Sequence, residues 1–108
     1  MELIEITWAA GSIDEARLVS RYLVQERYAA EAKIIPWIES ISVWNNQLET
    51  DQETLVVLKT TKEHLNKAID VILKNSKMQV PEIVWRTLEG GHQEYLDWLE
   101  NSTKLARA

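Results

Sequence analysis

Residues 29–60 predict a β-hairpin that is longer than its own domain requires. Residues 33–44 are rich in Ile, Val and Trp, which favour strands, and residues 47–59 run back into the apolar block 55–58. Asn45 and Asn46 stand between the arms, and asparagine tolerates the positive φ of a tight turn. Each arm would be about 40 Å long, whereas a domain of about 100 residues has a radius of gyration of about 13 Å. We therefore expect the hairpin to project beyond its core.

A projecting hairpin would leave four large apolar side chains without cover from their own domain. An exposed apolar strand pair is an aggregation hazard unless neighbouring copies bury it. The sequence therefore predicts a closed homo-oligomer. The residues expected in its interface are Trp37, Ile41, Val43 and Trp44.

Length and composition limit the possible classes of protein. A chain of 108 residues with 45% hydrophobic content supports one domain, which we place at residues 1–101, followed by a C-terminal tail at 102–108. Its 12 basic and 17 acidic residues give a net charge of −5, which argues against nucleic acid as a partner. The absence of cysteine excludes disulfides, thiolate metal sites and a cysteine nucleophile.

The N-terminal segment predicts a strand and not an export signal. Glu2 and Glu5 stand where a secretory signal would carry positive charge. No apolar run approaches the 18 or more residues of a membrane span. We therefore expect a cytoplasmic protein with no membrane partner.

The remaining elements follow from two periodicities. Apolar residues alternate from Ile4 to Trp8, as in a strand that is covered on one side. Ser12 and Glu15 form a capping box, and helical spacing then continues to about Arg27. Three further elements complete the chain: a helix at 62–75, a strand at 82–88 and, after a Gly-Gly break, a helix at 92–101.

The order β-α-β-β-α-β-α is typical of the α+β, ferredoxin-like split βαβ sandwich. Its four-stranded sheet carries helices on one face and leaves the other face bare. Apolar residues on both faces of the hairpin indicate that other protomers cover the bare face.

Three carboxylates could give the hairpin a role in cation binding. Glu49, Asp51 and Glu53 alternate along the third strand, so they share one face of the sheet. Hard divalent cations favour such oxygen ligands. The alternative is a solvated acidic face that blunts the edge of the hairpin.

The other possible metal ligands are isolated in the sequence. His64 and His92 have no second ligand at helical spacing, so we expect each to be a surface histidine. Met78 could bind copper(I) through its thioether or could pack against a neighbouring segment.

Catalysis is not expected. The turn after the first strand lacks a phosphate-binding glycine pattern, and Asp14 and Glu15 would repel phosphate. Neither histidine stands in a pattern typical of a catalytic triad.

An ordered set of short segments resembles the CutA family of divalent-cation tolerance proteins. The set extends over most of the chain, from about Ile4 to Trp98. Its members are Ile34-Ile35-Pro36, Ser40, Trp44, Glu53, Lys59-Thr60, Val80-Pro81-Glu82-Ile83 and the pair Tyr95 and Trp98. The resemblance implies a ferredoxin-like subunit in a tight homotrimer with the long hairpin bound to its neighbours. It also implies an architecture similar to that of the PII signalling proteins.

The chain departs from the family pattern where the family is expected to hold copper. Residues 31–33 read Glu-Ala-Lys in place of the family's Cys-Val-Asn, so a soft ligand is replaced by a carboxylate. Residues 76–79 read Ser-Lys-Met-Gln in place of a His-containing segment. Two smaller changes are Ser42 for a tyrosine and Asn46 for a glycine. Any copper or other divalent ion is therefore expected to bind weakly.

Two functions remain open from the sequence. The first is a non-catalytic trimer of divalent-cation tolerance or homeostasis. The second is a PII-like sensor that binds a small anionic ligand in clefts between subunits, with Lys59, Thr60 and Glu82 as candidate cleft residues. The alternative role for these polar residues is an ion pair between strands or subunits.

Overall fold

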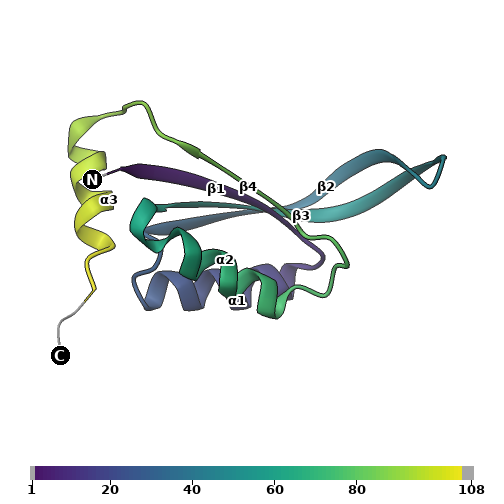
Figure 1. Ribbon diagram of the computed structural model, residues 1–108, viewed down its shortest axis with the longest axis horizontal. Helices are drawn as coiled ribbons and strands as arrows, with labels where there is room; N and C mark the ends of the chain where they lie inside the picture. Colours follow the sequence, from purple (N-terminus) through teal and green to yellow (C-terminus); the bar gives the residue numbers. More distant parts are fainter. Residues whose placement is uncertain (1, 106–108) are drawn as a thin grey trace.

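The computed structural model describes residues 2–105 and contains a four-stranded antiparallel sheet and three α-helices. The elements, in chain order, are β1 (Leu3–Ala10), α1 (Ile13–Gln25), β2 (Glu31–Trp44), β3 (Gln47–Thr61), the 3₁₀ turn η1 (Lys62–His64), α2 (Leu65–Asn75), β4 (Glu82–Thr87) and α3 (Gln93–Ser102). The sheet order is β2-β3-β1-β4, and α1 and α2 cover one face (Figure 1). This arrangement confirms the predicted α+β, ferredoxin-like split βαβ fold.

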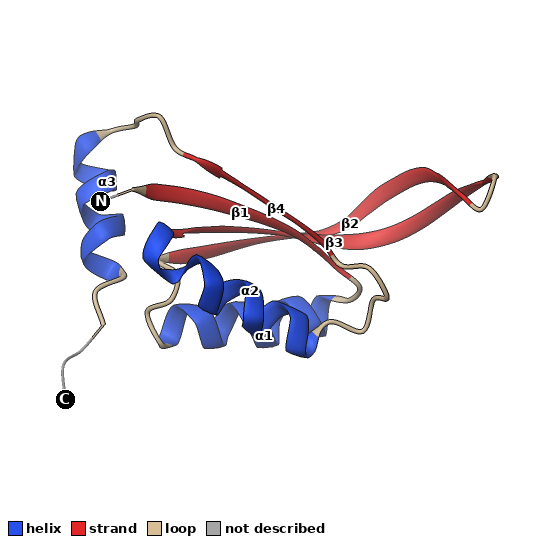
Figure 2. Ribbon diagram, viewed as in Figure 1, coloured by secondary structure: helices blue, strands red, loops and turns tan. Residues whose placement is uncertain are grey.

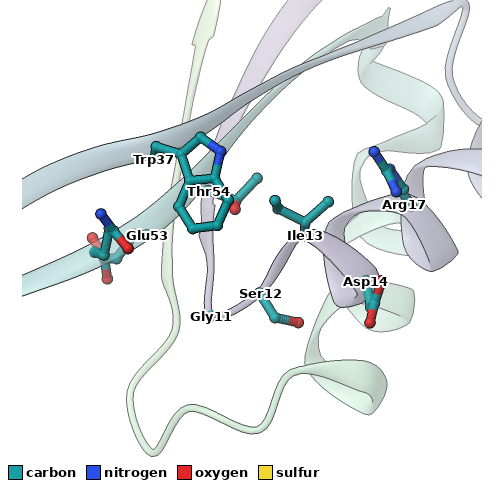
Figure 3. A pocket seen from close by; sticks show the side chains of 9 residues that line it. Gly11, Ser12, Ile13, Asp14, Arg17, Trp37, Glu53 and Thr54 are labelled. Carbon is teal, nitrogen blue, oxygen red and sulfur yellow. The ribbon is translucent and has the colours of Figure 1, made fainter.

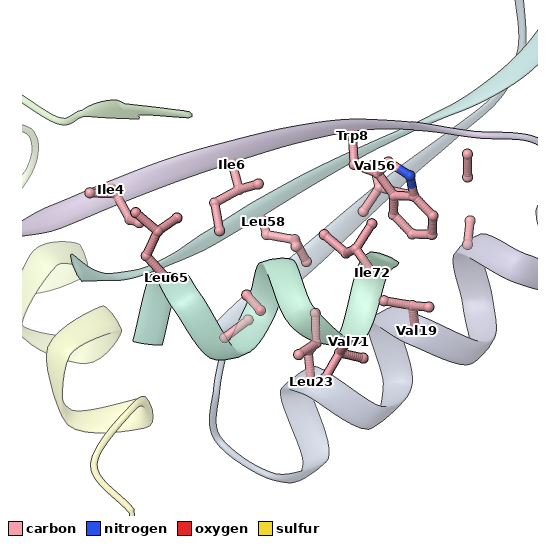
Figure 4. Packing of buried hydrophobic residues seen from close by; sticks show 14 residues of the cluster. Ile4, Ile6, Trp8, Val19, Leu23, Val56, Leu58, Leu65, Val71 and Ile72 are labelled. Carbon is pink, nitrogen blue, oxygen red and sulfur yellow. The ribbon is translucent and has the colours of Figure 1, made fainter. Parts of the chain in front are cut away.

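The core lies between the sheet and the two helices that cover it. On β1, Ile4, Ile6 and Trp8 are fully buried because a side-chain period of two turns all three toward the helices. Val56 and Leu58 face the same way from β3, opposite Trp8 and Ile6. Figure 4 shows these side chains meeting those of α1 and α2, among them Val19, Leu23, Val71 and Ile72.

The N-terminal ends of α1 and α2 differ in their side-chain capping. The Ser12 hydroxyl accepts a hydrogen bond of 3.1 Å from the backbone N–H of Glu15, which is the capping contact predicted for α1. The second helix was expected to begin at Lys62, but Lys62–His64 form a 3₁₀ turn and α2 begins at Leu65. No side chain caps either start, so the tighter turn precedes the regular helix.

The β2-β3 hairpin projects beyond the helices, as predicted (Figure 2). The described chain measures 48 × 30 × 21 Å, and its radius of gyration of 14.8 Å exceeds the value of about 13 Å for a compact chain of this length. Asn45 and Asn46 form the turn with φ angles of 52° and 63°, in the left-handed region expected for them.

A β-bulge interrupts the hairpin near its base. The register between β2 and β3 shifts between Ile35 and Ile38, and Trp37 has a φ of 64°. Pro36 has no N–H to donate to a ladder, which places proline at edge strands and bulges. The bulge interrupts the regular alternation of β2 at Trp37, whose side chain lines a hollow at the turn between β1 and α1.

The third helix stands at the end of the sheet where β2 begins (Figure 1). Leu99 is fully buried, and Nε2 of His64 donates a hydrogen bond of 2.7 Å to the carbonyl oxygen of Thr103. The expectation of a surface histidine at position 64 is therefore wrong, because the residue is only 5% exposed. His92 is exposed, as expected.

The last described element is the helix α3. Helix α3 ends at Ser102, and residues 106–108 of the expected tail lie outside the described residues. Among residues 2–105, no helix is both long and apolar enough to cross a membrane.

Candidate functional site

The carboxylates predicted from the sequence lie in one hollow on the projecting part of the hairpin. This acidic hollow has a volume of about 350 Å³ and contains no lysine, arginine or histidine in its lining. It brings Glu49, Asp51 and Glu53 of β3 together with Glu82 of β4. The remaining lining residues are Ser40, Ser42, Trp44, Met78, Gln79 and Val80.

The spacing of the acidic residues limits what the hollow can bind. Successive side chains on one face of a strand are about 7 Å apart, whereas the oxygens around a divalent ion lie about 2.0–2.6 Å from the metal. Accordingly, residues 2–105 contain no group of three or more His, Cys, Asp or Glu side chains arranged to hold a metal ion. In the single chain the hollow offers diffuse negative charge and not a closed coordination shell.

Met78 lies in the loop before β4 and is partly buried. It lines the acidic hollow, and its side chain also lies close to the turn at Gly11. The thioether thus stands beside carboxylates, which are hard ligands, with no imidazole in the same hollow.

A charged network crosses the sheet face that α1 and α2 leave uncovered. Glu5 on β1 contacts two basic side chains at once. Its Oε1 lies 3.2 Å from Nζ of Lys59, and its Oε2 accepts a hydrogen bond of 3.0 Å from Nε of Arg86. These contacts join β3, β1 and β4. Lys59 is therefore engaged in an ion pair between strands.

The three residues proposed for an anion cleft do not form one cleft in the single chain. Thr60 is fully buried on the helix side, where its hydroxyl donates a hydrogen bond of 2.7 Å to the carbonyl oxygen of Tyr28. Lys59 pairs with Glu5 and Glu82 pairs with Ala9 in the sheet. Glu5 and Ala9 are four positions apart on β1, so Lys59 and Glu82 lie about 13 Å apart along the strand direction.

A hydrogen bond between Tyr95 and Glu31 was not predicted from the sequence. The Tyr95 hydroxyl donates to Oε1 of Glu31, and the Tyr95 ring stacks on Trp98 with centroids 5.7 Å apart. Burial, followed by the hydrogen bond to Glu31 and the charges of Glu31 and Glu5, raises the pKa of Tyr95 to about 12. Glu31, which replaces the family's soft metal ligand, thus anchors α3 through this hydrogen bond.

The four predicted interface residues are all exposed in the single chain. The exposed fractions are 66% for Trp37, 61% for Ile41, 68% for Val43 and 56% for Trp44. Trp37 stands over a second hollow of about 460 Å³ at the turn between β1 and α1, near Ser12 and Arg17 (Figure 3). Gly11 in this turn does not have a positive φ, which fits an ordinary strand-to-helix connection.

These features define a small protein of ferredoxin-like fold whose long hairpin carries an acidic hollow. The chain belongs to the family described as CutA1 divalent ion tolerance protein, whose sequence profile matches residues 4–102. The divalent-cation tolerance protein CutA of Thermus thermophilus is 38% identical over 102 residues, which are 94% of this chain and 97% of that protein. The recognition of the family from its short segments is confirmed.

Other relatives agree with the family but differ in length. The chloroplastic CutA of Arabidopsis thaliana is 33% identical over 91 residues, covering 84% of this chain and 50% of that protein. The chain thus spans about half the length of this plant relative. Among solved structures, CutA1 from Oryza sativa has a TM-score of 0.90 at 29% identity and covers 96% of this chain and 95% of its own. CutA from Xylella fastidiosa has a TM-score of 0.89 at 30% identity, with 96% and 100% covered.

Proposed function

We propose that this chain is a non-catalytic, homotrimeric protein of divalent-cation tolerance or homeostasis, in which the projecting hairpin makes both the assembly contact and the cation-attracting surface. The observation that carries the proposal is the hairpin itself, which has exposed tryptophans and an acidic hollow on one projecting ribbon. Membership of a family named for divalent ion tolerance supports the cation role.

The apolar exposure of the subunit supports assembly. Large apolar patches on a soluble subunit mark interaction surfaces. In addition to the hairpin residues, Val84 on β4 and Ile35 on β2 are 58% and 47% exposed. Val84 lies beside Thr7 and Ile35 lies beside Leu55, on the sheet face that the helices leave uncovered. A partner subunit on this face would therefore bury both residues together with the hairpin.

The ligand chemistry supports weak cation binding and not a tight copper site. At position 31, Oε1 of the carboxylate accepts a hydrogen bond from Tyr95, and His64 is buried and hydrogen-bonded to Thr103, so both residues already make contacts that hold α3 in place. Binding through the oxygens of Glu49, Asp51 and Glu53 alone should be no tighter than the range of about 10⁻⁴ to 10⁻³ M that is typical of weak all-oxygen sites.

The alternative of a PII-like anion sensor receives less support. Lys59 and Arg86 both engage Glu5, so a ligand anion would have to displace an existing carboxylate. A cytoplasmic location stays a prediction, since relatives carry names that specify chloroplasts and the periplasm.

Isothermal titration with copper(II), zinc and magnesium tests the cation role. We expect weak binding that is lost when Glu49, Asp51 and Glu53 are changed together to Gln, Asn and Gln. The matched control removes three exposed carboxylates elsewhere and should retain binding: Glu26→Gln, Glu89→Gln and Glu94→Gln. A submicromolar copper dissociation constant that is abolished by replacing His64, His92 or Met78 would refute the proposal.

A further inference from the structure

A third hollow lies at the end of the molecule opposite the hairpin tip. This edge hollow, about 610 Å³ in volume, is bounded by the C-terminal half of α1, the first residues of β2 and Trp98 of α3. These three elements meet where β2 begins (Figure 1). Its volume is within the range of about 300–1,000 Å³ that is typical of small-molecule sites.

The walls of the edge hollow are mostly apolar. Val24 and Trp98 are 37% and 47% exposed, and both line it. The aliphatic side chains of Ala30, Ala32 and Ile34 complete this surface. A site with such walls favours an apolar ligand body over an ion.

Trp98 is held as a fixed aromatic surface. Its ring stacks on that of Tyr95 at an interplanar angle of 30°, and Tyr95 is in turn fixed by its hydrogen bond to Glu31. Aromatic rings prefer offset stacked or edge-to-face contacts, so a planar ring is a suitable partner for the remaining face of Trp98.

The polar groups at the edge hollow favour a negatively charged end on the ligand. Arg21 forms no ion pair with any described residue. The one lining carboxylate, Glu31, is hydrogen-bonded to Tyr95 and lies 3.9 Å from Nζ of Lys33. Arg21 is therefore the lining charge that has no partner in the described structure.

We propose that the edge hollow binds a planar aromatic carboxylate. The ring would lie against Trp98, with its edges on Val24 and Ile34. The carboxylate would accept hydrogen bonds from the Arg21 guanidinium, whose planar pair of donors matches the two carboxylate oxygens. This site is separate from the acidic hollow and does not depend on divalent cations.

A titration with naphthoate tests the proposal. Binding is measured by calorimetry and by NMR of the indole and guanidinium side-chain signals. We expect saturable binding that shifts the signals of Trp98 and Arg21. Naphthalenemethanol, a neutral analogue of similar shape, should bind about tenfold more weakly, since a hydrogen bond between charged groups is lost.

Arg21→Gln should weaken naphthoate binding by about tenfold. The matched control is Arg17→Gln, which removes the same charge from α1 outside the edge hollow and should leave the affinity unchanged. Both arginines are exposed, so neither variant depends on refolding of the core. Equal affinity for the acid and the alcohol, equal effects of the two variants, or no saturable binding because another copy covers Trp98 would each overturn the proposal.

Discussion

The hydroxyl of Tyr95 in α3 donates a hydrogen bond to the carboxylate of Glu31, the first residue of β2. This contact joins segments that are 64 positions apart in the chain. It holds α3 against the start of the hairpin strand and fixes the stacked Trp98. Burial and the nearby carboxylates of Glu31 and Glu5 both disfavour an ionised phenolate, so the folded protein requires Tyr95 to keep its proton.

Alkaline pH should release this anchor. The pKa of Tyr95 is raised from 10.0 to about 12, so the folded state keeps a proton that the unfolded chain loses in this window. The unfolding free energy should therefore fall as pH rises from 10 to 12, and Tyr95→Phe should remove that part of the slope. Urea unfolding at several pH values, with tyrosinate absorbance, measures both effects. Tyr22→Phe is the control on an exposed ring and should leave the slope intact.

The buried contact between His64 and Thr103 predicts a stability cost. Replacing His64 by Leu leaves the Thr103 carbonyl without its partner in a buried position, which should lower the unfolding free energy by about 1–3 kcal/mol. Urea denaturation measures the loss. His92→Leu, at an exposed position, should change stability little. Equal effects of the two substitutions would show that the buried hydrogen bond does not stabilise α3.

The stability of the hairpin turn should depend on how well the residue at position 46 tolerates a positive φ. Asn46 has a φ of 63°, and the left-handed region costs an ordinary residue about 1–2 kcal/mol. Asn46→Val should therefore lower the melting temperature, whereas Asn46→Gly should retain it. If valine is tolerated as well as glycine, the turn adopts another conformation in solution.

Elements with a regular period could be predicted from the sequence. Alternation from Ile4 to Trp8 and the capping residue Ser12 specified β1 and the start of α1, because both signals are local. The turn at Asn45 and Asn46 followed from the positive φ that asparagine accepts. Recognition of the family then rested on short segments in a fixed order.

The remaining features depend on contacts between distant segments. His64 has no distinctive local pattern, and it is buried only because α3 brings the Thr103 carbonyl to it. The carboxylates of β3 do share one hollow, yet strand spacing keeps them from converging on one ion. Pro36 within an apolar strand is the one local signal for the bulge at Trp37, because proline cannot donate to a central ladder.

If the exposed tryptophans of the hairpin form the proposed interface, a charged residue introduced there should disrupt the trimer. Trp44→Asp should dissociate the assembly, since truncation of an interface aromatic commonly costs about 2 kcal/mol or more, and a buried unpaired charge costs more. Leu18→Asp is the matched control, because Leu18 is 63% exposed on α1, away from the hairpin. Sedimentation velocity should show a smaller species for the first variant alone. An unchanged sedimentation coefficient for Trp44→Asp would exclude this part of the hairpin from the interface.

The solution mass of the unmodified protein is the direct test of the proposed trimer. One chain has a mass of 12.5 kDa. Multi-angle light scattering at micromolar concentration should give a mass about three times this value, without dependence on divalent cations, because the interface is apolar. A stable species of 12.5 kDa under these conditions would contradict the proposed trimer and leave the exposed face of the hairpin without its explanation.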